Sequence, residues 1–393
     1  MRTASKAAET AQRLTEYTEG LATGRIHAKL VPRGPSSAAW STPDNSAEAR
    51  KLWSQRLSIE PIQLDLCALP SVYDAAKGLA AKYPRIDSII CNAGIGGWSG
   101  LSWFGLIKQA ITEGPMHAVS EPKYKICRVG AVADRQLIRV TDAGGKDVTD
   151  DEPKLAEVFC ANLFGHYVLV HEILSLLERS PGTERARVIW VSTVEAYKHY
   201  FKPDDFQGFK SSNAYESSKR LTDLLVLSAA TPGGNQWVKQ YLGDQTSTQG
   251  MRRSTRVAAA KNATVPPNMY LSHPGICATA ILPIATVLVW GQMIAFFLCR
   301  VFGSYWHTTV KSAAVTAPVW LALEEDHVLE EDKIAEKKWG SAAGRWGEEN
   351  VRETHVEELG SSTFADLGAR CWEEMEDLRV EWDGRVKEWQ ADQ

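Results

Sequence analysis

The sequence lacks the signatures of three protein classes. Its seven cysteines are scattered and include no Cys-x-x-Cys pair, which argues against a zinc site or a disulfide framework and favours reduced thiols in a cytosol-facing protein. A formal net charge of -4 gives no support for binding nucleic acid, which calls for a basic face. The hydrophilic N-terminus has no apolar core of a secretion signal. No metal site is expected.

The length and composition of the chain agree with a globular enzyme. The chain has 393 residues, of which 44% are hydrophobic, enough for one large α/β core with appendages or for two smaller domains. Short apolar stretches alternate with helical ones, which predicts parallel βαβ units in an α/β, doubly wound sheet. Strands are expected at 61–66, 86–91, 187–191 and 269–272, and helices at 5–20, 75–83, 152–179 and 213–230.

Tyr215 and Lys219 carry the strongest chemical signal. A spacing of four on a helix places the phenol beside the ammonium. The unperturbed pKa of a tyrosine is about 10, and a fixed cation would lower it toward the range useful for proton donation to a carbonyl. The alternative is an ordinary helix surface, where the lysine stem merely covers an aromatic ring.

Three further features precede this pair. Ser192 ends a short apolar strand, at the edge where open α/β sheets place their ligands, and could hold a carbonyl or only cap a turn. Asn92, Ala93 and Gly94 follow another strand, where small residues let a flat ring approach the backbone. Asn162 lies in an apolar helical run, and its amide could bond neighbouring backbone or hold a water in a proton relay.

In this order, these residues resemble the short-chain dehydrogenase/reductase family, which has a Rossmann-like sheet. The resemblance implies a catalytic set made of Asn162, Ser192, Tyr215 and Lys219. It also implies a bound nicotinamide cofactor, with Tyr215 as acid and Lys219 lowering the pKa of that tyrosine and binding the ribose. The implied cofactor contacts are Asp65 at the adenine, Asn92, Ala93, Gly94, Lys219, and the loop residues Pro274, Gly275 and Thr279.

A closer similarity is to the sterol 3-keto reductases. It is carried by a long insert at about 98–151, by the segment 215–225 and by the segment 338–347. It implies NADPH-dependent reduction of a 3-keto sterol intermediate to the 3-hydroxy sterol, with Arg2 as a contact for the 2′-phosphate. The rivals are reduction of another lipophilic carbonyl and a non-catalytic scaffold or pseudoenzyme.

The sequence departs from the family at the phosphate-binding turn. Relatives begin with a strand followed by Thr-Gly-x-x-x-Gly-x-Gly, whose glycines let the pyrophosphate approach a helix N-terminus. The present sequence has no such stretch. The expectation is therefore a truncated product whose sheet misses its first strand and which binds the cofactor poorly.

Residues 1–323 are expected to form the dehydrogenase-like domain, with inserts at about 98–151 and 231–264 and an apolar lid at 280–302. Residues 280–299 carry no charge, and we expect a monotopic lid resting on a membrane rather than a span; an entirely buried lid is the alternative.

Residues 324–393 are expected to form a charged, solvent-exposed extension, with Trp339 and Trp346 as anchors. The resemblance implies the cytosolic face of the endoplasmic reticulum or lipid droplets, beside other sterol C-4 demethylation enzymes.

Overall fold

A computed structural model of the chain describes residues 4–23, 46, 48, 55–140, 146–148, 152–179, 184–230, 236–243, 264–277 and 286–392. Arg2 and Thr279, two of the expected cofactor contacts, lie outside these residues, as does the first part of the expected lid, 280–285.

The central element is a five-stranded sheet in the order β1-β6-β7-β10-β11. Its strands are β1 (Ser88–Cys91), β6 (Arg187–Val191), β7 (Asn268–His273), β10 (Lys338–Ala343) and β11 (Glu349–Thr354). The first four run parallel, and β11 pairs antiparallel with β10. A mostly parallel sheet with covering helices confirms the expected α/β class.

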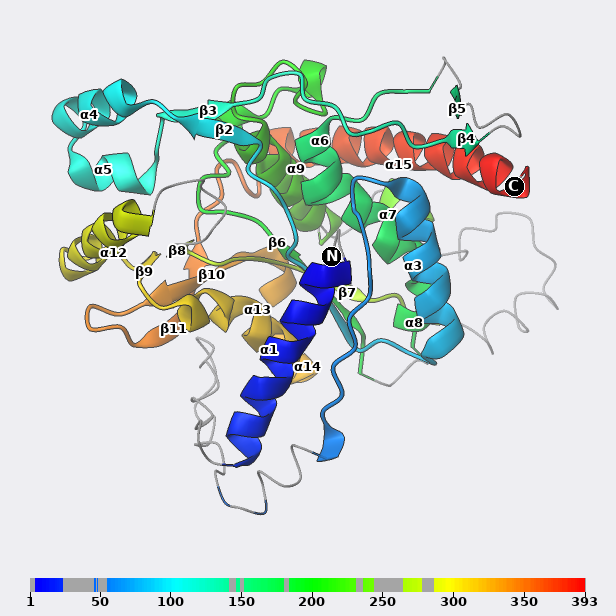
Figure 1. Ribbon diagram of the computed structural model, residues 1–393, viewed down its shortest axis with the longest axis horizontal. Helices are drawn as coiled ribbons and strands as arrows, with labels where there is room; N and C mark the ends of the chain where they lie inside the picture. The colour runs from blue at the N-terminus through cyan, green and yellow to red at the C-terminus, as the bar shows by residue number, and fades with distance from the viewer. Residues whose placement is uncertain are drawn as a thin grey trace.

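Alternate residues of the central strands face two separate cores. Val188 and Trp190 of β6 belong to one apolar cluster, which includes residues of α3 (Leu69–Lys82), α7 (Gly165–Glu172), α9 (Ala214–Ala229) and α15 (Ser362–Ala391). Ile189 faces the other cluster, with residues of α13 (Thr316–Leu323) and α14 (Asp326–Glu331). Helices therefore cover both faces of the sheet, as a doubly wound fold requires (Figure 1).

The expected strand at 61–66 is wrong. Residues 57–65 adopt no regular secondary structure, and within the described chain β1 forms the edge of the sheet, with Ile90 41% exposed. The apolar alternation of this segment gives it strand propensity, but a strand also needs a neighbour to bond with.

The expectation that the C-terminal segment stays in solvent is also wrong. All six residues of β10 are buried, and Trp339 packs in the second core, although Trp346 is 73% exposed. α15 lies along α9, where the indole N–H of Trp372 donates to the Leu225 carbonyl oxygen over 2.9 Å. Most charges of α15 lie on its outer side, apart from the buried Glu376 and Arg379, while Trp372 and Trp382 complete the core.

Residues 98–127 of the insert build a lobe at one end of the molecule (Figure 1, left), whereas β4 (Ile138–Val140) and β5 (Lys146–Val148) of the same insert lie toward the opposite side of the view. β2 (Trp98–Leu101) and β3 (Lys125–Cys127) form an antiparallel pair that encloses α4 (Trp103–Thr112) and α5 (Pro115–Ser120). α12 (Thr286–Val301) packs against α5. Within the described residues, no helix is both long and apolar enough to cross a bilayer.

The remaining elements connect or flank these units. They are α1 (Ala4–Ala22), β4 (Ile138–Val140), β5 (Lys146–Val148), α6 (Glu157–Phe159), the π-helical turn Cys160–Phe164, α8 (Leu174–Leu177), α10 (Gln236–Tyr241), β8 (Ile276–Cys277) and β9 (His307–Thr308). The helices expected at 5–20 and 213–230 match α1 and α9 closely, whereas the one expected at 152–179 begins only at Glu157.

Candidate active site

A cavity of about 1270 Å³ opens where β1, β6 and β7 end. Parallel strands bring their carboxyl ends to one edge of a sheet, so residues from distant parts of the sequence meet there. The cavity brings together most of the site residues expected from the sequence: Asn92 and Gly94 after β1, Ser192 after β6, Pro274 and Gly275 after β7, and Tyr215 and Lys219 from α9.

Tyr215 and Lys219 lie side by side on α9. The Lys219 ammonium is 5.8 Å from the centroid of the Tyr215 ring and donates to the Val191 carbonyl oxygen over 2.7 Å. Lys219 is 4% exposed, and burial lowers its pKa to about 8. The expected pairing is confirmed.

The expected lowering of the Tyr215 pKa is wrong. Burial raises this pKa, and the carboxylates of Glu195 and Glu216 raise it further, because they repel a phenolate. A hydrogen bond between the side chains of Thr193 and Tyr215 acts in the opposite direction. Tyr215 is therefore held as a protonated phenol, ready to give up its proton only to a group that becomes strongly basic.

The two hydroxyl residues at the end of β6 have different surroundings. Ser192 donates to the carboxylate of Asp223 over 2.5 Å and is 2% exposed. Thr193 lies near Tyr215 and lowers the pKa of that phenol, and the Thr193 hydroxyl accepts from the Glu195 backbone N–H at 3.4 Å. Both residues line the cavity, but the Ser192 hydroxyl is bonded to Asp223, whereas Thr193 is the residue that lowers the pKa of the phenol.

Asn162 holds the turn that follows β1. Its amide exchanges two hydrogen bonds with the backbone of Ile95, of 2.7 and 3.0 Å, and donates to the Ser218 hydroxyl over 3.1 Å. A Cβ added at Gly94 would lie 2.6 Å from the Asn162 side-chain oxygen, so glycine is needed here. The amide thus has the backbone-bonding role considered above, and the relay role stays a prediction. Asn162 sits in the π-helical turn, a distortion that is frequent at functional sites.

The loop after β7 gives its backbone to the cavity wall. Gly275 has φ +70°, and a Cβ there would lie 2.6 Å from the carbonyl oxygens of Trp306 and Ser341. Asn92 and Ala93 are exposed at the facing turn, where the Ala93 carbonyl oxygen lies 2.9 Å from Nε2 of His166. The turn after β1 and the loop after β7 therefore flank the cavity with small residues, and small residues let a flat ring lie close to the backbone.

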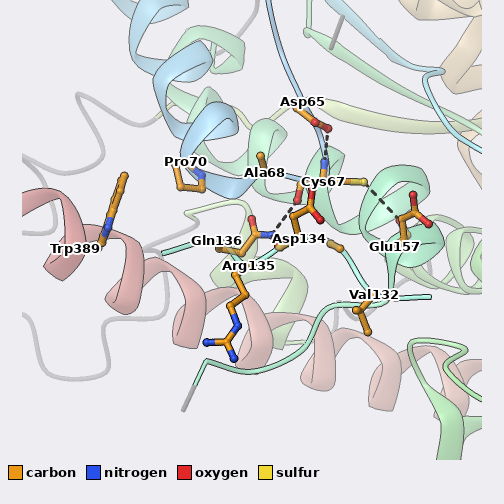
Figure 2. A pocket seen from close by; sticks show the side chains of 11 residues that line it. Asp65, Cys67, Ala68, Pro70, Val132, Asp134, Arg135, Gln136, Glu157 and Trp389 are labelled. Atoms are coloured by element: carbon orange, nitrogen blue, oxygen red, sulfur yellow. Dashed lines mark hydrogen bonds between the residues drawn. The ribbon is translucent and has the colours of Figure 1, made fainter. Parts of the chain in front are cut away.

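Asp65 does not share this cavity. It lines a smaller pocket of about 330 Å³, together with residues 132–136 of the insert, Glu157 and Trp389 of α15. Figure 2 shows its carboxylate turned toward the Cys67 backbone N–H, from which it accepts a 3.0 Å hydrogen bond. The structure therefore does not bring Asp65 together with Asn92 and Gly94.

A buried charge cluster lies beside Tyr215, and the sequence alone did not predict it. Lys125 of β3 bonds with Glu195, over 2.6 Å, and with Glu216, which directly follows Tyr215. Burial raises the pKa of Glu195 to about 7. The three residues are too far apart in the sequence for any spacing rule to connect them, although Lys125 lies in the insert that the resemblance had singled out.

Comparison with known proteins identifies the family. The 3-keto-steroid reductase of Aspergillus fumigatus is 36% identical over 387 aligned residues, covering 88% of this chain and 82% of the relative. The chain belongs to the 3-keto-steroid reductase family. The Gibberella zeae member is 32% identical, covering 97% of this chain and 86% of the relative, and the Kluyveromyces lactis member is 29% identical. No family model matches the chain.

Solved structures give a weaker likeness. A short-chain dehydrogenase from Salmonella enterica covers 75% of this chain at 13% identity with a TM-score of 0.33. At that value the likeness adds nothing to the assignment of this 3-keto-steroid reductase family member.

The cavity is large, and its two ends differ in character. Its volume of about 1270 Å³ exceeds the ~300–1,000 Å³ of pockets for a single drug-sized ligand. The backbone-rich turns at Asn92–Gly94 and Pro274–Gly275 suit the nicotinamide end of a cofactor. The opposite wall is mostly apolar and is formed by β2, α4, α12 and α13, with Leu101, Leu106, Phe296 and Val319 among its residues.

Proposed function

We propose that this chain reduces the C-3 ketone of a sterol intermediate to the 3-hydroxy sterol, with NADPH as reductant. The observation that carries the proposal is that Tyr215, Thr193 and Lys219 stand at the polar end of one large cavity whose other walls are mostly apolar. Such a cavity accepts a big hydrocarbon skeleton and leaves its single ketone at the proton donor.

The residues of the chain supply a proton and an orientation. The cofactor, when bound, supplies the hydride. Tyr215 gives its proton to the ketone oxygen as negative charge develops there, and the Thr193 hydroxyl donates a hydrogen bond to the same oxygen. The ammonium of Lys219 stabilises the phenolate that Tyr215 leaves behind. Thr193 takes the role that the resemblance gave to Ser192, because the Ser192 hydroxyl is engaged by Asp223.

NADPH rather than NADH rests on the family resemblance alone. The sequence contains no glycine-rich phosphate turn, so the pyrophosphate has fewer backbone donors to bind. We therefore predict that the purified chain binds NADPH with a Kd weaker than micromolar, measured by fluorescence titration. Micromolar or tighter binding would contradict this prediction.

We propose that the mouth of the cavity docks on a membrane surface. Seven large apolar side chains around it are exposed; this apolar mouth consists of Trp103, Phe104, Ile107 and Ile111 of α4 and Trp290, Ile294 and Phe297 of α12. Neither helix contains an aspartate or glutamate, and Lys108 is exposed on α4. An apolar surface with only positive charge suits anionic lipid head groups. The proposal keeps the expected membrane contact at 280–302 and adds α4 to it.

The cellular site and the partners follow from the family resemblance and are part of the proposal. We propose the cytosolic face of the endoplasmic reticulum or of lipid droplets, close to the other enzymes of sterol C-4 demethylation. Imaging of the tagged chain with organelle markers checks this, and a diffuse signal through the cytosol would count against it.

The proposed reaction is tested with the full chain, NADPH and a 4-demethylated 3-keto sterol. Mass spectrometry should detect the 3-hydroxy sterol, and expression should restore growth in cells that lack 3-keto sterol reduction. Turnover of a retinoid or polyketide ketone without turnover of the sterol would favour another lipophilic substrate. Binding of the sterol without any turnover would favour a scaffold.

A further inference from the structure

An ion pair is completely buried behind the catalytic residues. The Lys338 ammonium of β10 lies 2.6 Å from the Asp223 carboxylate of α9, and the two residues are 2% and 1% exposed. Removing two charges from water costs several kcal/mol per ion, and an apolar pair of the same size is often equally stable. Stability alone therefore gives little reason for charges at these positions.

The pair holds the end of β6 from two sides. Asp223 accepts from the Ser192 hydroxyl over 2.5 Å, and Lys338 donates to the Thr193 carbonyl oxygen over 2.7 Å. One helical turn before Asp223, Lys219 donates to the Val191 carbonyl oxygen over 2.7 Å. Three consecutive residues of the strand end are thus bound to charged side chains of α9 and β10.

We propose that Asp223 and Lys338 are positioning residues for the reductase reaction, which fix the strand end so that the Thr193 hydroxyl faces Tyr215. The inference rests on the proposed function. β10 is joined to β7 by the backbone ladder from Lys338↔Leu271 onward, so the strand does not need this side chain to stay in the sheet. The Lys338 side chain instead reaches across to the Thr193 carbonyl. It connects the C-terminal part of the chain directly to the catalytic strand end.

The same pair sets the charge around Lys219. After burial, which lowers the Lys219 pKa to about 8, Asp223 raises this pKa and Lys338 lowers it. Cys91 of β1 also faces the ammonium, but burial raises its pKa to about 12 and keeps it neutral. Among the described residues, two further neighbours are the phenol of Tyr215 and the buried His166, whose pKa is lowered to about 4, so that it is neutral too.

Removal of Asp223 should therefore lower the Lys219 pKa, and removal of Lys338 should raise it. Lys219 acts as a cation, so activity is present below its pKa and is lost as the pH rises through it. Asp223→Asn should shift the high-pH limb of kcat to lower pH, and Lys338→Met should shift it to higher pH. Both should reduce kcat by about 10²-fold, the scale of a misplaced catalytic group, with much smaller changes in KM.

The experiment measures kcat, KM and their pH profiles for the full chain and four variants. These are Asp223→Asn, Lys338→Met, the double variant, which leaves no unpaired buried charge, and Glu376→Gln as control. Glu376 forms an equally buried pair with Arg379, over 2.8 Å on α15 and away from the cavity lining. Glu376→Gln should lower the stability of the fold without changing the pH at which kcat falls. ¹⁵N NMR of the Lys219 ammonium, assigned with Lys219→Arg, gives its pKa without turnover.

The two readouts separate the inference from the proposed function. If the wild-type chain turns over no sterol, the proposed reaction fails and the NMR titration alone decides the role of the pair. The double variant should fold and lose as much kcat as the worse single variant, because both residues hold one strand end. A folded double variant with wild-type kcat, or an unchanged Lys219 pKa in both single variants, would overturn the proposal.

Discussion

The polar end and the apolar mouth of the cavity are built in opposite ways. At the polar end, Lys219, Asp223 and Lys338 are almost fully buried, and each has a bonded partner. At the mouth, Phe104 is 80% exposed and Trp290 is 67% exposed. The polar end keeps a few groups in one geometry, as proton transfer requires, whereas the mouth offers a surface to an apolar environment. Substitutions at the two ends should therefore affect different steps.

The largest effect is expected at the polar end, from Lys219→Met. Loss of the ammonium removes the charge that stabilises the Tyr215 phenolate, so kcat should fall about 10²–10⁴-fold. Lys311 also lines the cavity but does not lie on α9, and it provides the matched control. In steady-state kinetics, the kcat of Lys219→Met should lie below that of Lys311→Met by most of this factor. Equal losses of kcat in the two variants would contradict a catalytic role for Lys219.

A smaller effect should separate the two hydroxyls at the end of β6. Thr193→Val removes the donor to the ketone oxygen and should lower kcat about 10–100-fold, with the folded state retained. Ser192→Ala leaves Asp223 short of one hydrogen bond and should lower the unfolding free energy by about 1–3 kcal/mol. Its loss of kcat should be smaller than that of Thr193→Val. If Ser192→Ala lost more kcat than Thr193→Val, Ser192 rather than Thr193 would be the donor to the ketone oxygen.

The smallest effect on chemistry is expected at the mouth. The triple variant Phe104→Asp, Ile107→Asp and Trp290→Asp should float with liposomes at least several-fold less than wild type, because charges replace the side chains that would enter the lipid. Exposed substitutions change stability by only about 0.5 kcal/mol, so the fold should persist. The control is Val380→Asp on α15, which is 49% exposed and does not line the cavity.

Flotation and the elution volume together decide whether the mouth faces lipid or a second copy of the chain. Equal flotation of the triple variant and of Val380→Asp would contradict a lipid-facing mouth. If wild type instead stays soluble and elutes as a dimer that the triple variant loses, the mouth is a contact between two copies of the chain.

Local spacing was the part of the site that sequence could predict. The Tyr215–Lys219 pair depends only on helix geometry, and the strand ends at Asn92, Ser192 and Pro274 converge because parallel strands point one way. Which hydroxyl faces the phenol was not predictable, because β6 is buried on both faces and shows no alternating pattern.

Errors arose wherever a segment depends on distant partners. The stretch around Asp65 has the sequence pattern of a strand, but within the described part of the chain it pairs with no other strand. β10 reads as part of a charged tail, yet all its residues are buried between β7 and β11. Asp223, Lys125 and Lys338 carry no local signal, since each acquires its role from burial and from contacts with residues at least 31 positions away.

The most direct test of the central claim is the kcat of Tyr215→Phe with a 3-keto sterol at saturating NADPH. We expect a fall of about 10²–10⁴-fold with KM nearly unchanged, since the ring stays in place and only the proton donor is removed. Tyr200→Phe, which removes a hydroxyl that donates to Glu121 over 3.2 Å, should keep most of the activity. Wild-type kcat in Tyr215→Phe would contradict proton donation by this phenol.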